Sequence, residues 1–353
     1  MPLIRLWQRR VLALFGALGC GVLLAEVAAR TLAAEPLAPP RGEGEVLVES
    51  ETPERGWQLV PGTCFTLHYP DPDGTERIVT HDVGPHGWRG APFAPEKRPG
   101  SIRIATVGDS HTFGWGVAED QTLAQQLERE LRERGCEVEV LNLGIPNTNV
   151  EEKAWVIEHV ALPAHCDVIV LQLHFDDNAL NGVDLGRRAG HAWAAGARPE
   201  ASGATLEWLR EHLACVRVVT EGLKRQRASR AYVTRHLAAM RPGHPARERV
   251  DAALRRVREL ASAQGATVVS ILYPLPVRDA SGWASKPLDD QLELASREAG
   301  LAVLSMAPAF DACGGPVHVH PLDPHVDAKA QRAAAAATAQ FLLEQELVPA
   351  ARR

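Results

Sequence analysis

The amino-acid sequence predicts an α/β fold in which a parallel sheet is covered by helices on both of its faces. From residue 101 onward, short apolar runs alternate with longer amphipathic segments. Runs such as CDVIVLQLHF contain too few polar residues for a strand with one face in water, which indicates strands buried on both faces. The composition, with 45% hydrophobic and 23% charged residues, is that of a globular protein with a sizeable core.

The N-terminus differs from the rest of the chain. Arg5, Arg9 and Arg10 precede the apolar run VLALFGALGCGVLLAEVAAR, and positive charge before an apolar segment is typical of a secretory signal or a signal anchor. A helix from Val11 to Ala29 would just cross the roughly 30 Å hydrocarbon core of a membrane. We expect residues 1–32 to be a single-pass anchor in the cell membrane, with the body on the periplasmic or extracytoplasmic side. A signal peptide cut within RTLAAEP is the alternative.

A linker and a small β-rich extension follow, over residues 33–100. The stretch AAEPLAPPRGEGE is rich in proline, glycine and charge, as linkers are. The runs GWQLV, CFTLHY and RIVTHDVG resemble short strands, but they are too few to predict a separate domain.

The main domain is predicted over residues 101–347. Its first half reads as the strand SIRIATVGDS, the helix QTLAQQLERELRERG, the strand EVEVLNLGI, the helix NVEEKAWVIEHVAL and the strand CDVIVLQLHF. Its second half reads as the helix ARERVDAALRRVRELASAQG, the strand TVVSILYPLP, the helix PLDDQLELASREAG, the strand LAVLSMAP and a closing helix AKAQRAAAAATAQFLLEQEL. Residues 179–245 interrupt this order as a helical insertion, which is either a lid over the site or a peripheral addition.

Charge and cysteine usage exclude some functions. A formal net charge of -6 and an aromatic content of 5% argue against nucleic-acid binding. The six cysteines include no CxxC pair, so a structural zinc site is not predicted, and the sequence assigns no disulfide pairing.

The stretch IRIATVGDSHTFGWGV places Ser110 where a buried strand ends, and parallel sheets carry their sites at such ends. A serine nucleophile needs a base, a group that orients the base, and donors for the oxyanion. In HVHPLDPHVDAKAQR, His325 is the candidate base and Asp323 the candidate orienting group. Gly144 lies at the end of the second strand and Asn178 follows the third, and both are candidate oxyanion donors.

A metal site is the alternative interpretation of the same C-terminal segment. A divalent ion could be bound by His318, His320, His325 and Asp323, because alternate residues on a strand share one face. Such a site would activate water instead of a serine. Asp109, next to the serine, is interpreted as a structural turn residue.

The segment VGDSHTFGWGV resembles the first block of the SGNH (GDSL-type) hydrolases. The preceding run GPHGWRGAPFAPEKRPGSIRIA is similar to membrane-anchored, exported members, and the resemblance extends over about residues 84–345. It implies a three-layer α/β/α, flavodoxin-like parallel sheet and no cofactor. It also implies a triad of Ser110, His325 and Asp323, with an oxyanion hole formed by the N–H groups of Ser110 and Gly144 and by an asparagine.

Two departures from the family pattern stand out. The third block of the family has Asn followed by Asp, whereas this chain has LHFDDNAL, with Asp176 or Asp177 near the expected position of the asparagine. A carboxylate there would repel an oxyanion, so Asn178 is preferred on chemical grounds. The second departure is that only Pro324 separates Asp323 from His325, where the family often has two residues.

The sequence therefore predicts a serine esterase or acyl hydrolase. Its expected substrates are carbonyl esters, O-acetyl or other small acyl esters, of envelope glycans or lipids. An O-acyltransferase of an exported polysaccharide and a catalytically inactive SGNH-fold binding protein are the alternatives.

Overall fold

The computed structural model describes residues 17, 19–30, 39–71, 74–174, 177–178, 204–279 and 282–349. Its centre is a five-stranded parallel sheet, which confirms the predicted α/β class. The strands are β6 (Ile102–Gly108), β7 (Val138–Gly144), β8 (Val168–His174), β9 (Thr267–Tyr273) and β12 (Ala302–Ser305).

The order of the strands fixes where a site can form. Across the sheet the order is β12-β9-β8-β6-β7, so the chain leaves β6 on one side to form β7 and returns on the other side as β8. This is the flavodoxin-like order, in which ligands bind outside the carboxyl ends of the strands where the winding reverses. The end of β6, next to Ser110, lies at that switch point.

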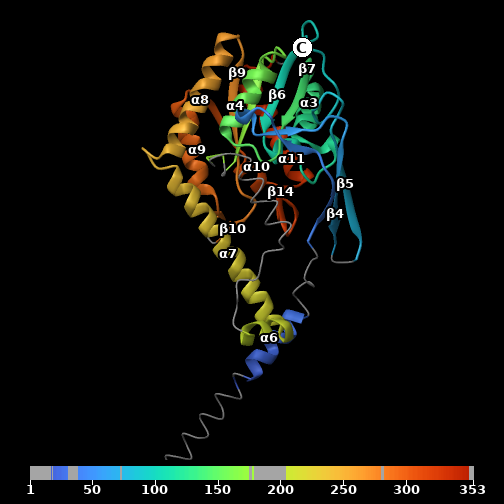
Figure 1. Cartoon of the computed structure of the whole chain (residues 1–353), viewed down its shortest axis with the longest axis vertical. Helices are drawn as coiled ribbons and strands as arrows, with labels where there is room; N and C mark the ends of the chain where they lie inside the picture. The colour runs from blue at the N-terminus through green and yellow to red at the C-terminus, as the bar shows by residue number, and fades with distance from the viewer. Residues whose placement is uncertain are drawn as a thin grey trace, which may run out of the picture.

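Helices cover both faces of the sheet. On one face lie α3 (Leu123–Glu133) and α11 (Ala328–Glu344), and on the other lie α4 (Val150–Val156), α8 (Pro245–Ala263) and α9 (Lys286–Glu298) (Figure 1). Side chains of β6 alternate between the two cores, because Ala105 and Val107 pack on one side and Ile104 on the other. Burial of both faces is the reason that the strand sequences are continuously apolar.

The main helices begin at residues that cap them. Thr122, Asn149 and Asp327 precede α3, α4 and α11, and each side chain accepts a hydrogen bond from a backbone N–H of the first turn. Gly135, the last residue of the first predicted helix, has a φ of 81° and lies two residues after α3 ends.

The β-rich segment before the sheet forms two small antiparallel sheets. One contains β1 (Arg41–Gly44), β4 (Cys64–Pro70) and β5 (Glu76–Asp82), and the other pairs β2 (Leu47–Glu49) with β3 (Trp57–Leu59). Three buried residues of the first sheet, Leu67, Tyr69 and Val79, pack against Trp115 and Val319 of the main domain. The extension therefore packs on the main domain near the loop that follows Ser110.

The remaining elements are short. They are η1 (Pro53–Arg55), α2 (Ser110–Phe113), η2 (Glu119–Gln121), the π-helical η3 (Ile157–Ala161), β10 (Arg278–Asp279), β11 (Gly282–Trp283), α10 (Ala307–Asp311), β13 (His318–His320) and β14 (Asp323–Val326). The two strands β13 and β14 form an antiparallel hairpin directly before α11.

The insertion forms α6 (Ala204–His212) and the long helix α7 (Ala214–Ala239). In Figure 1, α7 runs away from the sheet to α6, which lies beside the N-terminal helix of residues 19–30 and far from β14. The carboxylate of Glu26 accepts the backbone N–H groups of Ala214 and Cys215, both at 3.0 Å. In this position α6 does not cover the end of β14, and residues 179–203, for which a lid was also considered, lie outside the described residues.

The predicted membrane anchor is described only in part. Residues 1–16, 18 and 31–32 lie outside the described residues, and among the helices that are described none is both long and apolar enough to span a membrane. All six cysteines belong to the described part of the chain, and each is a free thiol.

Candidate active site

The turn after β6 presents Ser110 as the first residue of α2. Asp109 caps this helix, because its carboxylate accepts the His111 N–H at 2.8 Å. A methyl group on Gly108 would lie 2.1 Å from Oγ1 of Thr112, so a side chain at this position would displace the turn. Glycine at 108 therefore lets the strand end and the helix meet closely, with Ser110 at the switch point.

Ser110, His325 and Asp323 form a continuous series of hydrogen bonds. Oγ of Ser110 lies 2.8 Å from Nε2 of His325, and Nδ1 of His325 lies 2.5 Å from Oδ1 of Asp323. Asp323 and His325 alternate along β14 and so project to the same side of the hairpin. With the Nδ1 proton held by the carboxylate, Nε2 is left as the acceptor for the serine hydroxyl.

The alternative metal site is not supported. In His325, Nε2 contacts Ser110 and Nδ1 contacts Asp323. In His320, Nε2 contacts the Pro70 carbonyl oxygen and Nδ1 accepts the Leu322 N–H, so the ring nitrogens of both residues already have partners. Within the ranges that the structure describes, no group of three or more His, Cys, Asp or Glu residues is placed to hold a metal ion.

A side chain from the N-terminal extension also reaches the triad. The hydroxyl of Tyr69, on β4, donates a hydrogen bond of 2.9 Å to Oδ2 of Asp323. Burial alone would raise the pKa of Asp323, but the neighbouring His325 and the hydrogen bonds from His325 and Tyr69 bring it below its usual range. Asp323, which is 0% exposed, is thus held as a buried carboxylate.

The sequence of the central domain decides the family. The model of the GDSL-like lipase/acylhydrolase family matches residues 106–323, which is more than half of the chain. The chain belongs to this family. It is a carboxylic ester hydrolase by membership, which confirms the predicted class of enzyme and the SGNH resemblance. The matched region begins within β6, four residues before Ser110, and ends at Asp323.

Solved structures similar to this acylhydrolase share little sequence with it. They include the lipase/acylhydrolase from Enterococcus faecalis, at 15% identity over 71% of this chain and 100% of that one, with a TM-score of 0.42. The esterase EstA from Pseudoalteromonas sp. has 10% identity over 70% of this chain and 99% of that one, with a TM-score of 0.41. The acetyl xylan esterase AlAXEase has 12% identity, 68% and 100% coverage, and a TM-score of 0.40. No curated protein matches the chain by sequence.

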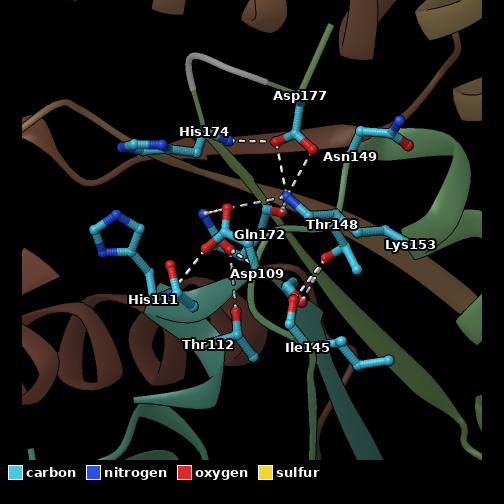
Figure 2. Close-up of polar contacts among 12 residues, drawn as sticks. Asp109, His111, Thr112, Ile145, Thr148, Asn149, Lys153, Gln172, His174 and Asp177 are labelled. Atoms are coloured by element: carbon cyan, nitrogen blue, oxygen red, sulfur yellow. Dashed lines mark hydrogen bonds and ion pairs between the residues drawn. The ribbon is translucent and has the colours of Figure 1, made fainter. Parts of the chain in front are cut away.

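Beneath the nucleophile turn of this acylhydrolase lies a buried lysine. Figure 2 shows Lys153, from α4, between two carboxylates: Nζ lies 3.2 Å from Oδ2 of Asp109 and 2.8 Å from Oδ2 of Asp177, and it donates to the Gln172 carbonyl oxygen at 3.0 Å. The Lys153 side chain is 1% exposed and that of Asp177 is 0% exposed. Burial would raise the pKa of Asp109, but the charge of Lys153 lowers it below its usual range. The network joins α4 to the ends of β6 and β8.

Asn178 does not lie with the triad of the acylhydrolase, which corrects the preferred interpretation of the third block. Its Nδ2 donates to the carbonyl oxygen of His236 at 2.8 Å, and its Oδ1 lies 2.5 Å from Nδ1 of that residue. The amide therefore faces α7 instead of Ser110. Asp177 faces Lys153, and Asp176 lies outside the described residues.

Gly144 has a packing role in this acylhydrolase that the sequence interpretation did not foresee. A methyl group here would lie 2.2 Å from the backbone nitrogen of Phe113, so glycine lets α2 pack on the end of β7. The Gly144 N–H donates to Oδ1 of Asn142 at 3.1 Å, which does not support its predicted role as an oxyanion donor. Three residues later Asn147 has a φ of 65°, an uncommon value for a residue other than glycine.

Proposed function

We propose that this acylhydrolase is a serine esterase in which Ser110 is the nucleophile, His325 the general base and Asp323 the group that orients the base. The observation that carries the proposal is the series of two hydrogen bonds, 2.8 and 2.5 Å long, that joins the three side chains. The catalytically inactive alternative is disfavoured because all three groups are present and in contact.

The reaction proceeds in two halves. As Oγ of Ser110 bonds to the ester carbonyl carbon, its proton passes to Nε2 of His325, and Asp323 stabilises the imidazolium. The C–O bond of the ester then breaks, and the alcohol leaves with the proton from His325. Water attacks the acyl-serine while His325 takes its proton, and that proton returns to Oγ as the acid departs. A sugar hydroxyl in place of this water would make the same site an acyltransferase.

The tetrahedral oxyanion needs donors other than Asn178. We assign this role to the backbone N–H of Ser110, at the start of α2, and to that of Asn147. Neither N–H has an acceptor among the described residues. The loop carrying Asn147 lies against the end of β6, because the Ile145 N–H donates to the Gly108 carbonyl oxygen at 3.0 Å. Two preorganised backbone donors are a common form of oxyanion hole.

The proposed substrates are O-acetyl or other small acyl esters of envelope glycans or lipids. This choice is supported by the predicted export of the chain and not by a shaped pocket. Hydrolysis of p-nitrophenyl acetate compared with longer p-nitrophenyl esters tests the size of the acyl group.

A fluorophosphonate probe tests the nucleophile without knowledge of the substrate. We expect one adduct, on Ser110 in the wild type, and no adduct in Ser110→Ala, when peptides are mapped by mass spectrometry. Ser305→Ala is the matched control, since Ser305 also ends a strand of the sheet and its Oγ accepts the Ala307 N–H. Labelling that persists in Ser110→Ala would refute the assignment.

We also propose that the N-terminal helix anchors the enzyme in the cell membrane with its body outside the cytoplasm. In support, the arginines at positions 5, 9 and 10 precede it, and Val22, Leu23, Leu24 and Val27 are exposed on it. The double variant Leu23→Arg with Leu24→Arg is expected to move the full chain from the membrane to the soluble fraction. Ile78→Arg, at an exposed apolar residue of β5, is expected to leave it in the membrane. Soluble wild-type protein would contradict the proposal.

A further inference from the structure

We propose that Tyr69 is a positioning residue of the triad, which makes the β4–β5 hairpin of the N-terminal extension part of the active site. The inference rests on the proposed function of Ser110, His325 and Asp323. It adds a fourth side chain, 254 positions before the aspartate that it contacts.

The hydrogen bonds of Asp323 show what Tyr69 does. Oδ1 accepts from the His325 ring at 2.5 Å and from the His325 backbone N–H at 3.1 Å. Oδ2 accepts from the Tyr69 hydroxyl at 2.9 Å. Because both oxygens have donors, the carboxylate is held against rotation, and the orientation of the imidazole follows from it.

The Tyr69 hydroxyl is a hydrogen-bond donor at neutral pH. The Tyr69 side chain is 0% exposed. Burial raises the pKa of its hydroxyl above the usual value, and the negative charge of Asp323 adds a smaller increase. The phenol therefore keeps its proton and offers it only to Oδ2. Without this donor, one oxygen of a buried carboxylate would lose a charge-assisted hydrogen bond.

Arg77 on β5 holds Tyr69 in place. Its guanidinium lies 4.3 Å from the centre of the Tyr69 ring, and it donates to the carbonyl oxygens of Gly116 at 3.1 Å and of Val319 at 2.7 Å. Gly116 belongs to the loop that follows the nucleophile helix, and Val319 belongs to the hairpin that carries the base. One side chain of the extension thus ties both halves of the triad together.

The loop after Ser110 leaves room for the β4–β5 hairpin at Gly116. Gly116 has a φ of 78°, and a methyl group on it would lie 2.5 Å from the Tyr69 hydroxyl oxygen. Nε2 of His81, on β5, accepts the Gly116 N–H at 2.9 Å, and burial, with the charge of Arg89, lowers the pKa of His81 to about 3. The His81 ring is therefore neutral and able to accept this bond at neutral pH.

The substitution Tyr69→Phe removes the hydroxyl and keeps the ring. Because Asp323 then becomes more basic, the Asp323–His325 pair binds a proton more tightly, and the neutral imidazole needed for catalysis forms at higher pH. We expect kcat for p-nitrophenyl acetate to fall about 10- to 100-fold, the range of one hydrogen bond to a charged group, with KM little changed. The acid limb of the kcat/KM profile should move up by about one pH unit.

Tyr273→Phe is the matched control. Its hydroxyl is also buried and contacts Oε1 of Gln331 at 3.4 Å, so its loss is expected to leave the acid limb in place. A role for Tyr69 in stability alone would lower the melting temperature without moving this limb. A wild-type kcat and acid limb in Tyr69→Phe would overturn the proposal.

Fluorophosphonate labelling separates this inference from the proposed function. If the wild type is not labelled at Ser110, the proposed function fails. If the wild type is labelled and Tyr69→Phe reacts with the same rate and pH profile, only the positioning role fails.

Should Tyr69→Phe not fold, Arg77→Gln, which keeps the hydroxyl and removes its tether, is expected to shift the same limb by less. An unshifted limb in folded Arg77→Gln would also overturn the proposal.

Discussion

Replacing His325 by alanine is expected to lower kcat for p-nitrophenyl acetate by about 10⁴- to 10⁶-fold, and adding Ser110→Ala should lower it little further. In the proposed mechanism both substitutions stop the same step, the transfer of the Ser110 Oγ proton to Nε2 of His325, which lies 2.8 Å away. Once that transfer is lost, the second side chain has nothing left to contribute. The remaining rate would come from substrate binding and the oxyanion donors.

The control for this prediction is His318→Ala, on the neighbouring strand of the same hairpin. It is expected to keep kcat within a few-fold of the wild type, because the described residues show no hydrogen bond between the half-buried His318 side chain and Ser110, His325 or Asp323. Steady-state kinetics of Ser110→Ala, His325→Ala and the double variant give a double-mutant cycle. Losses that add in the double variant would contradict a shared step. Equal losses in His318→Ala and His325→Ala, together with a loss of wild-type activity in EDTA that zinc restores, would favour the metal alternative.

The sheet was predictable because burial on both faces leaves a clear record in the sequence. The run IRIATVG in β6 has apolar residues that face both sides of the sheet, and parallel order follows from the helices between the strands. Ser110 was identifiable because it follows the carboxyl end of a parallel strand. His325 and Asp323, which lie on the antiparallel hairpin before α11, were identifiable from their spacing just before the last helix and from the family motif. The structure brings these three side chains together as the motif suggested.

The other contacts around Ser110, His325 and Asp323 were not predictable. They depend on the direction of each side chain and on contacts between residues far apart in the sequence. Asn178 has the right chemistry for an oxyanion donor, but the turn after β8 directs its amide to His236. Tyr69 lies in a short strand that no pattern connects with Asp323. Lys153 occurs in a charge-rich helix segment, where a lysine normally indicates a solvated face, and only packing shows it buried.

Replacing Lys153 by methionine is expected to lower the free energy of unfolding by about 3–5 kcal/mol at pH 7. Methionine keeps most of the volume but leaves the carboxylates of Asp109 and Asp177 buried without the ammonium between them. Urea unfolding, extrapolated linearly to water, measures the loss. Lys286→Met is the matched control, since its ion pair with Asp290 is exposed and such pairs contribute about 0–1 kcal/mol.

The pH dependence of Lys153→Met distinguishes lost charge pairing from lost packing. In the wild type the pKa of Asp109 lies below its unfolded value, so its contribution to stability is present above about pH 4 and is lost as the pH falls. In the variant, burial and the like charge of Asp177 raise the pKa of Asp109 above its unfolded value, so stability falls as the pH rises. The stability difference between wild type and variant should therefore shrink from pH 7 to pH 4.5.

Adding Asp177→Asn should recover part of the loss at pH 7, because only one unpaired carboxylate remains. A difference equal at both pH values, and unchanged by Asp177→Asn, would mean that the lysine acts through packing and not through its charge.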